Sequence, residues 1–222
     1  ARIHDGSAWR KLNLPHDWAI EGHFSPNNPS GTGGGALPGG VGWYRKTFTP
    51  TAEDSDKKLY IDFDGAYMNA TVYINGHELG TRPYGYISFS YDLTPYIEWG
   101  KPNVVAVRVD NAEQPNSRWY SGCGIYRHVW LNKVSPVHVA PFGTFVYAEM
   151  EAPFDRAELT VETTVQNMGL QTAAYRLTHV LLDAEGKEVT RCEAPGTHVL
   201  PKAKEQTLTR MTVDNPHLWS VD

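Results

Sequence analysis

One stretch of the sequence, residues 110–122, gathers the side-chain types that can recognise a sugar. It reads Asp-Asn-Ala-Glu-Gln-Pro-Asn-Ser-Arg-Trp-Tyr-Ser-Gly and follows an alternating apolar run. Planar carboxylate, amide and guanidinium groups can bridge neighbouring hydroxyls, while aromatic rings cover the apolar face of a sugar ring. Each residue alone also fits a structural role, because Asp and Asn cap turns, Trp packs between sheets and Arg forms exposed ion pairs. Their grouping makes ligand contact a candidate role for Asp110, Asn111, Arg118, Trp119 and Tyr120.

A second polar cluster, Leu14-Pro15-His16-Asp17-Trp18, places His16 and Asp17 behind a rigid proline. These two residues are sequence neighbours, which is poor geometry for an aspartate that orients a histidine base. The sequence has no Gly-x-Ser-x-Gly nucleophile elbow, no histidine pair at i,i+4 and no Cys/His cluster with zinc spacing. We therefore expect no catalytic residue, no metal site and no cofactor in this chain.

A glycine-rich stretch at residues 31–42 resembles a phosphate-binding loop only in composition. It lacks the Gly-Lys-Ser/Thr that grips a nucleotide, and no helix follows whose N-terminus could bind phosphate. The sequence favours a long irregular surface loop. A loop shaped to approach a ligand or a neighbouring domain closely is the alternative.

The elements that must position these clusters are strands, because apolar and polar residues alternate with a period of two. Asn75-Gly76 after an alternating run is the pattern of a tight hairpin, and Thr94-Pro95 predicts one short helical turn. Three tryptophans, Trp18, Trp43 and Trp130, are expected to pack inside the first sandwich. The alternating runs fall at residues 59–63, 72–74, 86–93, 104–109, 157–165 and 175–181.

The predicted fold class is all-β, with a domain boundary near residues 133–141, where two prolines flank a Val-rich stretch. Residues 1–135, with their longer loops, fit a jelly-roll β-sandwich. Residues 136–222 fit an immunoglobulin-like β-sandwich whose last strand is expected to follow Asp222.

Composition excludes several classes of partner. The chain has 20 Lys+Arg and 25 Asp+Glu, hence a net charge of −5, so it lacks the basic balance expected for binding nucleic acid or an anionic membrane. No apolar run approaches the roughly 18–20 residues that span a bilayer, and no signal peptide is visible at the first residues. The two cysteines lie far apart and predict no disulfide framework.

Five segments occur in the order typical of one enzyme family. They are Leu14–Trp18, residues 42–48, residues 72–76, residues 107–111 and the run Ser-Gly-Cys-Gly-Ile-Tyr-Arg-His-Val-Trp-Leu at residues 121–131. A further stretch, Asn-Pro-His-Leu-Trp at residues 215–219, lies near the end. With these segments the chain resembles glycoside hydrolase family 2, and most of all its bacterial β-galactosidase-type members.

The resemblance implies an architecture and a division of labour. Family 2 enzymes have a sugar-binding, galactose-binding-like jelly roll, an immunoglobulin-like sandwich and a (β/α)8 barrel that carries two catalytic glutamates. The first two domains would lie in this chain and the barrel beyond residue 222, so we expect the chain alone to be inactive. The jelly roll and the sandwich would support the barrel. The implied partners of this chain are the barrel and a terminal β-galactoside, and the longer protein could form a homo-oligomer.

The resemblance also assigns roles to single residues. Asp110 matches an aspartate at the galactose pocket, close to a bound sodium ion, so Na or Mg is possible in the longer enzyme. Arg118, Trp119 and Tyr120 match a segment that enters the same pocket in related β-glucuronidases, and His16 and Asp17 lie on another loop near the site. A periplasmic or secreted location is typical of bacterial polysaccharide-degrading enzymes.

Other functions stay open. A β-glucuronidase or β-mannosidase of the same family, a free-standing carbohydrate-binding module and a structural pair of cell-surface sandwiches are the alternatives.

Overall fold

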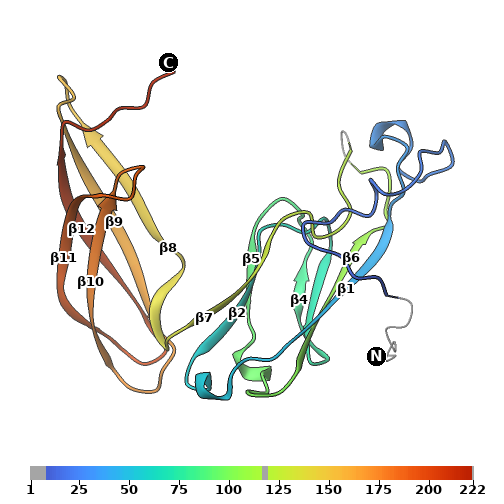
Figure 1. Ribbon diagram of the computed structural model, residues 1–222, viewed down its shortest axis with the longest axis horizontal. Coiled ribbons are helices and arrows are strands. Elements are labelled where there is room, and N and C mark those ends of the chain that lie inside the picture. Colours follow the sequence, from blue (N-terminus) through green and yellow to red (C-terminus); the bar gives the residue numbers. More distant parts are fainter. Residues whose placement is uncertain (1–8, 117–119, 222) are drawn as a thin grey trace. The chain divides into compact units, whose positions relative to one another are not determined.

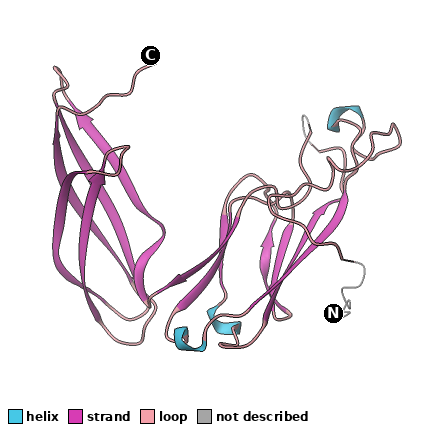
Figure 2. Cartoon of the chain, in the orientation of Figure 1, coloured by secondary structure: helices cyan, strands magenta, loops and turns pink. Residues whose placement is uncertain are grey.

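The computed structural model describes residues 9–116 and 120–221, and nearly all of its regular structure is β-strand (Figures 1 and 2). The chain forms two compact units, Ala1–Lys133 and Val134–Asp222. The all-β prediction is confirmed. No helix of the described part is long and apolar enough to cross a membrane.

The first unit contains a four-stranded and a three-stranded sheet. The larger sheet has the order β1-β6-β3-β4, formed by Gly40–Phe48, Asn103–Asn111, Ala70–Ile74 and His77–Arg82. The smaller has the order β5-β2-β7, formed by Phe89–Asp92, Lys58–Phe63 and Val129–Val134. Two short 3-10 turns lie on connections between the sheets, η2 (Ala52–Asp54) and η3 (Thr94–Tyr96), and a third, η1 (Thr32–Gly34), precedes β1.

The core of this unit follows from the alternation along its strands. Every second residue of β6, from Asn103 to Asn111, is buried, and the residues between them face outward. Apolar side chains of β2 and β5 join the same core, where the rings of Phe63 and Phe89 stack with centroids 4.8 Å apart. Burying such side chains stabilises the sandwich by about 1.5–3 kcal/mol each.

The local turn predictions are confirmed. Asn75 and Gly76 form the β3–β4 hairpin with φ angles of 48° and 84°, the left-handed conformation that such turns require. Thr94 and Pro95 open η3. The glycine-rich stretch is an irregular loop that contains η1, and β1 begins at Gly40.

The packing prediction for the tryptophans is wrong at two of three positions. Trp18 packs against the core, but Trp43 is 48% and Trp130 53% exposed. In β1 the inward position belongs to Tyr44, so the pleat turns Trp43 outward, where it stacks on Tyr73. Trp130 instead donates its indole N–H to Asp64 at 3.2 Å.

Four connections of the first unit meet at one end of the sandwich (Figure 1). The register pairs Gly40 at the start of β1 with Asn111 at the end of β6, and Phe63 at the end of β2 with Phe89 at the start of β5. The chain before β1 and the loops after β2, β4 and β6 therefore share this end. The second polar cluster and the loop after residue 110 are brought together there.

The second unit is a sandwich of a three-stranded and a two-stranded antiparallel sheet. The first has the order β12-β9-β8, formed by Lys204–Asp214, Arg156–Asn167 and Val137–Met150. The second pairs β10 (Ala173–Leu182) with β11 (Glu188–Val199). The alternation along residues 157–165 predicts one face of β9; of its members Ala157, Val161, Thr163 and Val165 are buried, and Leu159 is half-buried.

One histidine connects the two sheets of this unit. His179 on β10 lies with Nε2 2.8 Å from the Thr163 hydroxyl of β9 and Nδ1 2.8 Å from the Thr209 hydroxyl of β12. Both threonines are buried. Burial lowers the pKa of His179 below its ordinary value, because a low dielectric disfavours the charged ring.

This histidine predicts an acid-sensitive second unit. The unfolded chain takes up the proton first, so the stability from His179 is complete above pH 6.5, its ordinary pKa, and declines as pH falls from there to the folded-state pKa. We expect the melting temperature of this unit to fall over that window, and to fall less in His179→Gln, by scanning calorimetry between pH 5 and 8. His23→Gln, at an exposed position, is the control, and an equal pH response in both variants would contradict the assignment.

Candidate functional site

Asp110 stands at the loop end of β6 with its carboxylate facing out of the sheet. Arg108 lies two residues earlier on the same face and donates to one carboxylate oxygen at 2.7 Å, and the N–H of Ala112 donates to the other at 3.0 Å. The Ala112 N–H, and then the Arg108 guanidinium, hold the pKa of Asp110 below its ordinary value. Asp110 is therefore ionised at neutral pH and can only accept hydrogen bonds.

A hollow of about 300 Å³ opens beside this carboxylate. Its volume is at the lower end of the range for small-molecule sites, roughly 300–1,000 Å³. The lining is polar and carries two carboxylates and several amides, and it consists of Met68, Asn69, Asp110, Asn111, Glu113, Gln114, Pro115 and Asn116. Such a surface offers acceptors and donors to a small, hydroxyl-rich molecule.

Asn69 joins this hollow to its surroundings. Its side-chain amide donates to the carbonyl of Asp110 at 3.2 Å, and its backbone N–H donates to the carbonyl of Pro83 at 3.2 Å. Its φ of 47° lies in the left-handed region, which asparagine tolerates better than most residues. Asn69 is not among the site residues predicted from the sequence. The signal for it there is an asparagine just before a strand.

Asn111 has its polar atoms engaged within the protein. The side chain is 1% exposed, its amide donates to the Cys123 sulfur at 3.0 Å, and its oxygen accepts from Asn116 at 2.5 Å. Burial raises the pKa of Cys123 to about 11, so this thiol stays protonated. The geometry gives Asn111 the role of holding the loop, while its predicted contact with a sugar stays a prediction.

The N-terminal cluster forms a seam with residues 123–125. His16 N–H donates to the Ile125 carbonyl at 2.8 Å, and Trp18 N–H to the Cys123 carbonyl at 3.0 Å. Between these two bonds, one carboxylate oxygen of Asp17 accepts from the N–H groups of Ala19 and Cys123, both at 2.9 Å. The segments are thus joined by backbone and side-chain bonds at the same place.

The other oxygen of Asp17 accepts the hydroxyl of Tyr120. Burial, followed by this bond to Asp17, raises the pKa of Tyr120 above its ordinary value. The hydroxyl is therefore a committed donor, and Tyr120 is directed toward the seam.

His16 completes the seam on the core side. Its Nδ1 lies 2.7 Å from the hydroxyl of Tyr44, whose pKa burial raises to about 12. Its Nε2 lies 2.9 Å from the Arg10 guanidinium. His16 and Asp17 have been brought to the predicted end of the sandwich, but their polar atoms bind protein groups. Contact of either with substrate stays a prediction.

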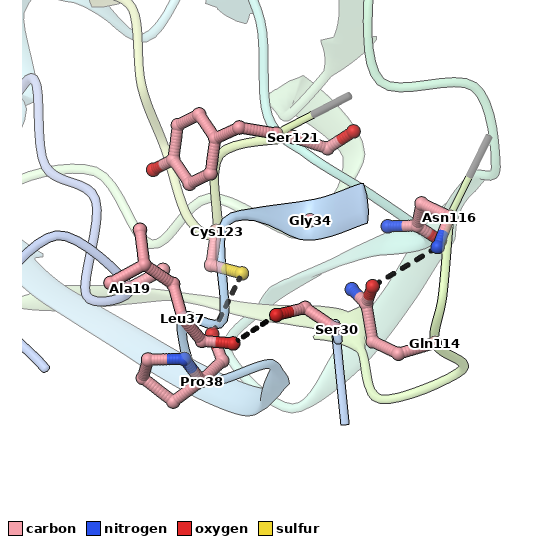
Figure 3. Close-up of a pocket in the computed structure, with 10 residues that line it drawn as sticks. Ala19, Ser30, Gly34, Leu37, Pro38, Gln114, Asn116, Ser121 and Cys123 are labelled. Atoms are coloured by element: carbon pink, nitrogen blue, oxygen red, sulfur yellow. Dashed lines mark hydrogen bonds between the residues drawn. The ribbon is translucent and has the colours of Figure 1, made fainter. Parts of the chain in front are cut away.

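A small cavity beside the seam is too narrow for a sugar (Figure 3). Its volume is about 10 Å³, at the limit for one water molecule. Ser30 donates to the Leu37 carbonyl at 2.6 Å and Asn116 N–H to the Gln114 side chain at 3.1 Å along its wall. The small cavity lies where the glycine-rich loop packs against the loop after β6.

The glycine-rich loop supports the site by close approach. A Cβ added at Gly39 would lie 2.7 Å from the Asn111 carbonyl, and one at Gly42 would lie 2.5 Å from the Trp18 ring. Either contact is shorter than atoms allow, so these glycines let the loop lie directly against both segments. The loop is irregular, as predicted, and its close contacts are with its own unit; a close approach to a ligand or a neighbouring domain stays a prediction.

Arg118 and Trp119, two of the predicted sugar contacts, lie outside the described residues. Within the described residues, no group of three or more His, Cys, Asp or Glu side chains could hold a metal ion. Of the seven predicted site residues, Asp110 is the one whose described geometry leaves a charged group at the edge of an open hollow.

Two family models match this chain. The galactose-binding-like domain of glycosyl hydrolase family 2 matches residues 41–133, and the glycosyl hydrolases family 2 model matches residues 137–222. The chain belongs to glycoside hydrolase family 2.

Relatives and solved structures agree with this assignment. A β-galactosidase of Bacteroides ovatus is 57% identical over 96% of this chain and 25% of its own length. A β-glucuronidase of Formosa agariphila is 30% identical over 97% of this chain and 24% of its own length. The crystal structure of a family 2 member from Bacteroides cellulosilyticus covers 99% of this chain and 29% of its own, with 36% identity and a TM-score of 0.92. The chain spans about a quarter of the length of the curated relatives it matches.

The seam predicts that Asp17→Ala destabilises the first unit. The change removes the acceptor of two N–H groups and one hydroxyl, and hydrogen bonds to a carboxylate contribute about 1.5–3 kcal/mol each. We expect a loss of roughly 2–4 kcal/mol in urea unfolding, because the freed groups recover part of this by binding water. Asp56→Ala, at an exposed position, should change the midpoint little, and equal midpoints for both variants would show that the seam is not needed.

Proposed function

We propose that this chain is the non-catalytic N-terminal part of a family 2 exo-glycosidase, most simply a β-galactosidase that removes terminal β-linked galactose. The ionised Asp110 at the rim of the hollow is the observation that carries this proposal. The 57% identity to a β-galactosidase supports the choice of sugar, and the quarter-length match supports a longer protein.

In this proposal the chain orients the sugar while another domain performs the chemistry. A retaining glycosidase needs two carboxyl groups about 5–5.5 Å apart on either side of the scissile bond. We expect these on a downstream (β/α)8 barrel. Asp110 would accept hydrogen bonds from sugar hydroxyls and fix the ring against the barrel, so its contribution is one of orientation.

The charge of the hollow favours a neutral sugar over a glucuronate. Asp110 is ionised, and Glu113 adds a second carboxylate to the same lining. A sugar carboxylate placed there would meet like charges, which costs free energy in a partly buried site. A β-glucuronidase stays the second candidate because relatives of that name match the chain. Nothing in the described hollow favours a β-mannosidase.

A free-standing carbohydrate-binding module is the alternative of a different class. It requires that residues 1–222 bind sugar without another domain. Titration calorimetry of the 222-residue chain with galactose and short β-galactosides separates the two, because half of a shared pocket should bind weakly or not at all. Tight binding would favour the module.

The remaining parts of the proposal concern partners and location. We infer that the longer protein contains a barrel domain, which is the main partner of this chain. The longer protein could also form a homo-oligomer and hold Na or Mg near the sugar. A periplasmic or secreted location fits a bacterial enzyme that acts on polysaccharides. Reading the coding sequence past Asp222 tests the central point, because a barrel with paired glutamates is expected and a stop codon would contradict the proposal.

Asp110→Asn in the longer protein tests the site. The amide keeps the size of the side chain but removes the negative charge that strengthens hydrogen bonds from sugar hydroxyls. We expect kcat/KM on an aryl β-galactoside to fall about 10- to 100-fold, the equivalent of losing one charge-assisted hydrogen bond. Asp56→Asn is the matched control, and melting curves exclude unfolding as the cause. An unchanged kcat/KM would remove Asp110 from the site.

A further inference from the structure

Two exposed tyrosines stand on the loop that connects β4 to β5. We call residues 83–87 the aromatic loop: Pro83, Tyr84, Gly85, Tyr86 and Ile87. Tyr84 is 57%, Tyr86 56% and Ile87 43% exposed. More than half of the surface of each tyrosine is therefore available to another molecule. The loop carries no acid or base other than the tyrosine hydroxyls.

The aromatic loop is held firmly although its rings are exposed. The Tyr84 and Tyr86 rings contact each other edge to face at 5.6 Å, and Tyr86 packs on Tyr67 at 5.1 Å. Tyr67 is buried, and its ring lies so close that a Cβ at Gly85 would be 2.2 Å from it. Tyr126 donates its hydroxyl to the Gly85 carbonyl at 2.8 Å. A surface fixed in this way loses little conformational entropy when it binds a ligand.

The loop adjoins the hollow through one residue. Asn69 lies between them, bonded to the Pro83 carbonyl on one side and to the Asp110 carbonyl on the other, both at 3.2 Å. Met68, which follows Tyr67, lines the hollow, and its carbonyl accepts from Asp110 N–H at 2.9 Å. The backbone of the aromatic loop therefore adjoins the residues that line the hollow.

We propose that Tyr84 and Tyr86 bind the saccharide unit that follows the terminal sugar, on the leaving-group side of the bond to be cleaved. Exposed rings with hydroxyl edges match a neutral pyranose, which presents C–H groups on its face and hydroxyls at its rim. This inference rests on the proposed function, since it assumes a terminal sugar beside Asp110. It makes the chain selective for oligosaccharides over galactosides with a small leaving group.

The test compares two substrates in the longer protein: a β-galactosyl disaccharide and β-galactosyl fluoride, whose leaving group is a single atom. Tyr84→Ala is the main variant because the Tyr84 ring pairs with Tyr86, whereas Tyr86 also packs on the buried Tyr67. We expect its kcat/KM on the disaccharide to fall about three- to tenfold, the scale of one aromatic contact, with little change on the fluoride. Tyr84→Phe should keep most of the activity. Tyr96→Ala, an exposed tyrosine of η3 at the other end of the sandwich, is the control.

Each other result overturns the inference in a recognisable way. An unchanged kcat/KM on both substrates in both Tyr84→Ala and Tyr86→Ala would remove the aromatic loop from sugar binding and leave the proposed function standing. An equal fall on both substrates would show that the rings support the fold or contact another domain. Failure of the unmodified protein to hydrolyse the fluoride would overturn the proposed function and this inference with it.

Discussion

The carboxylate of Asp17 is the group on which the arrangement of the candidate site depends. It joins the N-terminal segment to the chain after the 110–122 loop by accepting from Ala19, Cys123 and Tyr120. These segments are about a hundred residues apart in sequence, and neither belongs to a sheet at that point. Without a regular ladder, their backbone groups need other partners, since a buried unpaired N–H or C=O is costly. One carboxylate accepts two such N–H groups and the Tyr120 hydroxyl, and so holds the two segments together.

Strand β6 runs from the core of the first unit to the residues that line the hollow. Its buried residues alternate with outward ones along nine positions, and the last pair, Asp110 and Asn111, divides between the two sides. Asn111 turns inward and ties the loop to Cys123, whereas Asp110 turns outward and keeps its charge at the hollow. The pleat alone therefore separates a residue that holds the site from one that can contact a ligand.

Most of the fold could be predicted from the sequence, because period-two patterns and an Asn-Gly turn report local physics. The directions of Trp43 and Trp130 could not, since the pattern does not say whether the tryptophan or its apolar neighbour, Tyr44 or Val129, faces inward. The seam is also beyond sequence reasoning. His16 and Asp17 look equally polar whether they bind a sugar or a backbone, and only the pairing with residues 123–125 decides where their hydrogen bonds go. The aromatic loop carries no motif and Asn69 only the common Asn-x-Thr glycosylation pattern, and both gain meaning from their place near Asp110 in the fold.

The glycine-rich loop contains positions that tolerate a side chain and positions that do not. Its inner glycines press against Asn111 and Trp18, whereas a side chain at Gly33 would have no atom within 4 Å. Substitutions should therefore be tolerated at some positions of this loop and rejected at others. A side chain at Gly33 would alter only the surface, whereas one at Gly34 would clash with Ser30 and one at Gly39 would press on the strand end that carries Asp110. Sequence change at Gly33 therefore leaves the Asp110 carboxylate where it is.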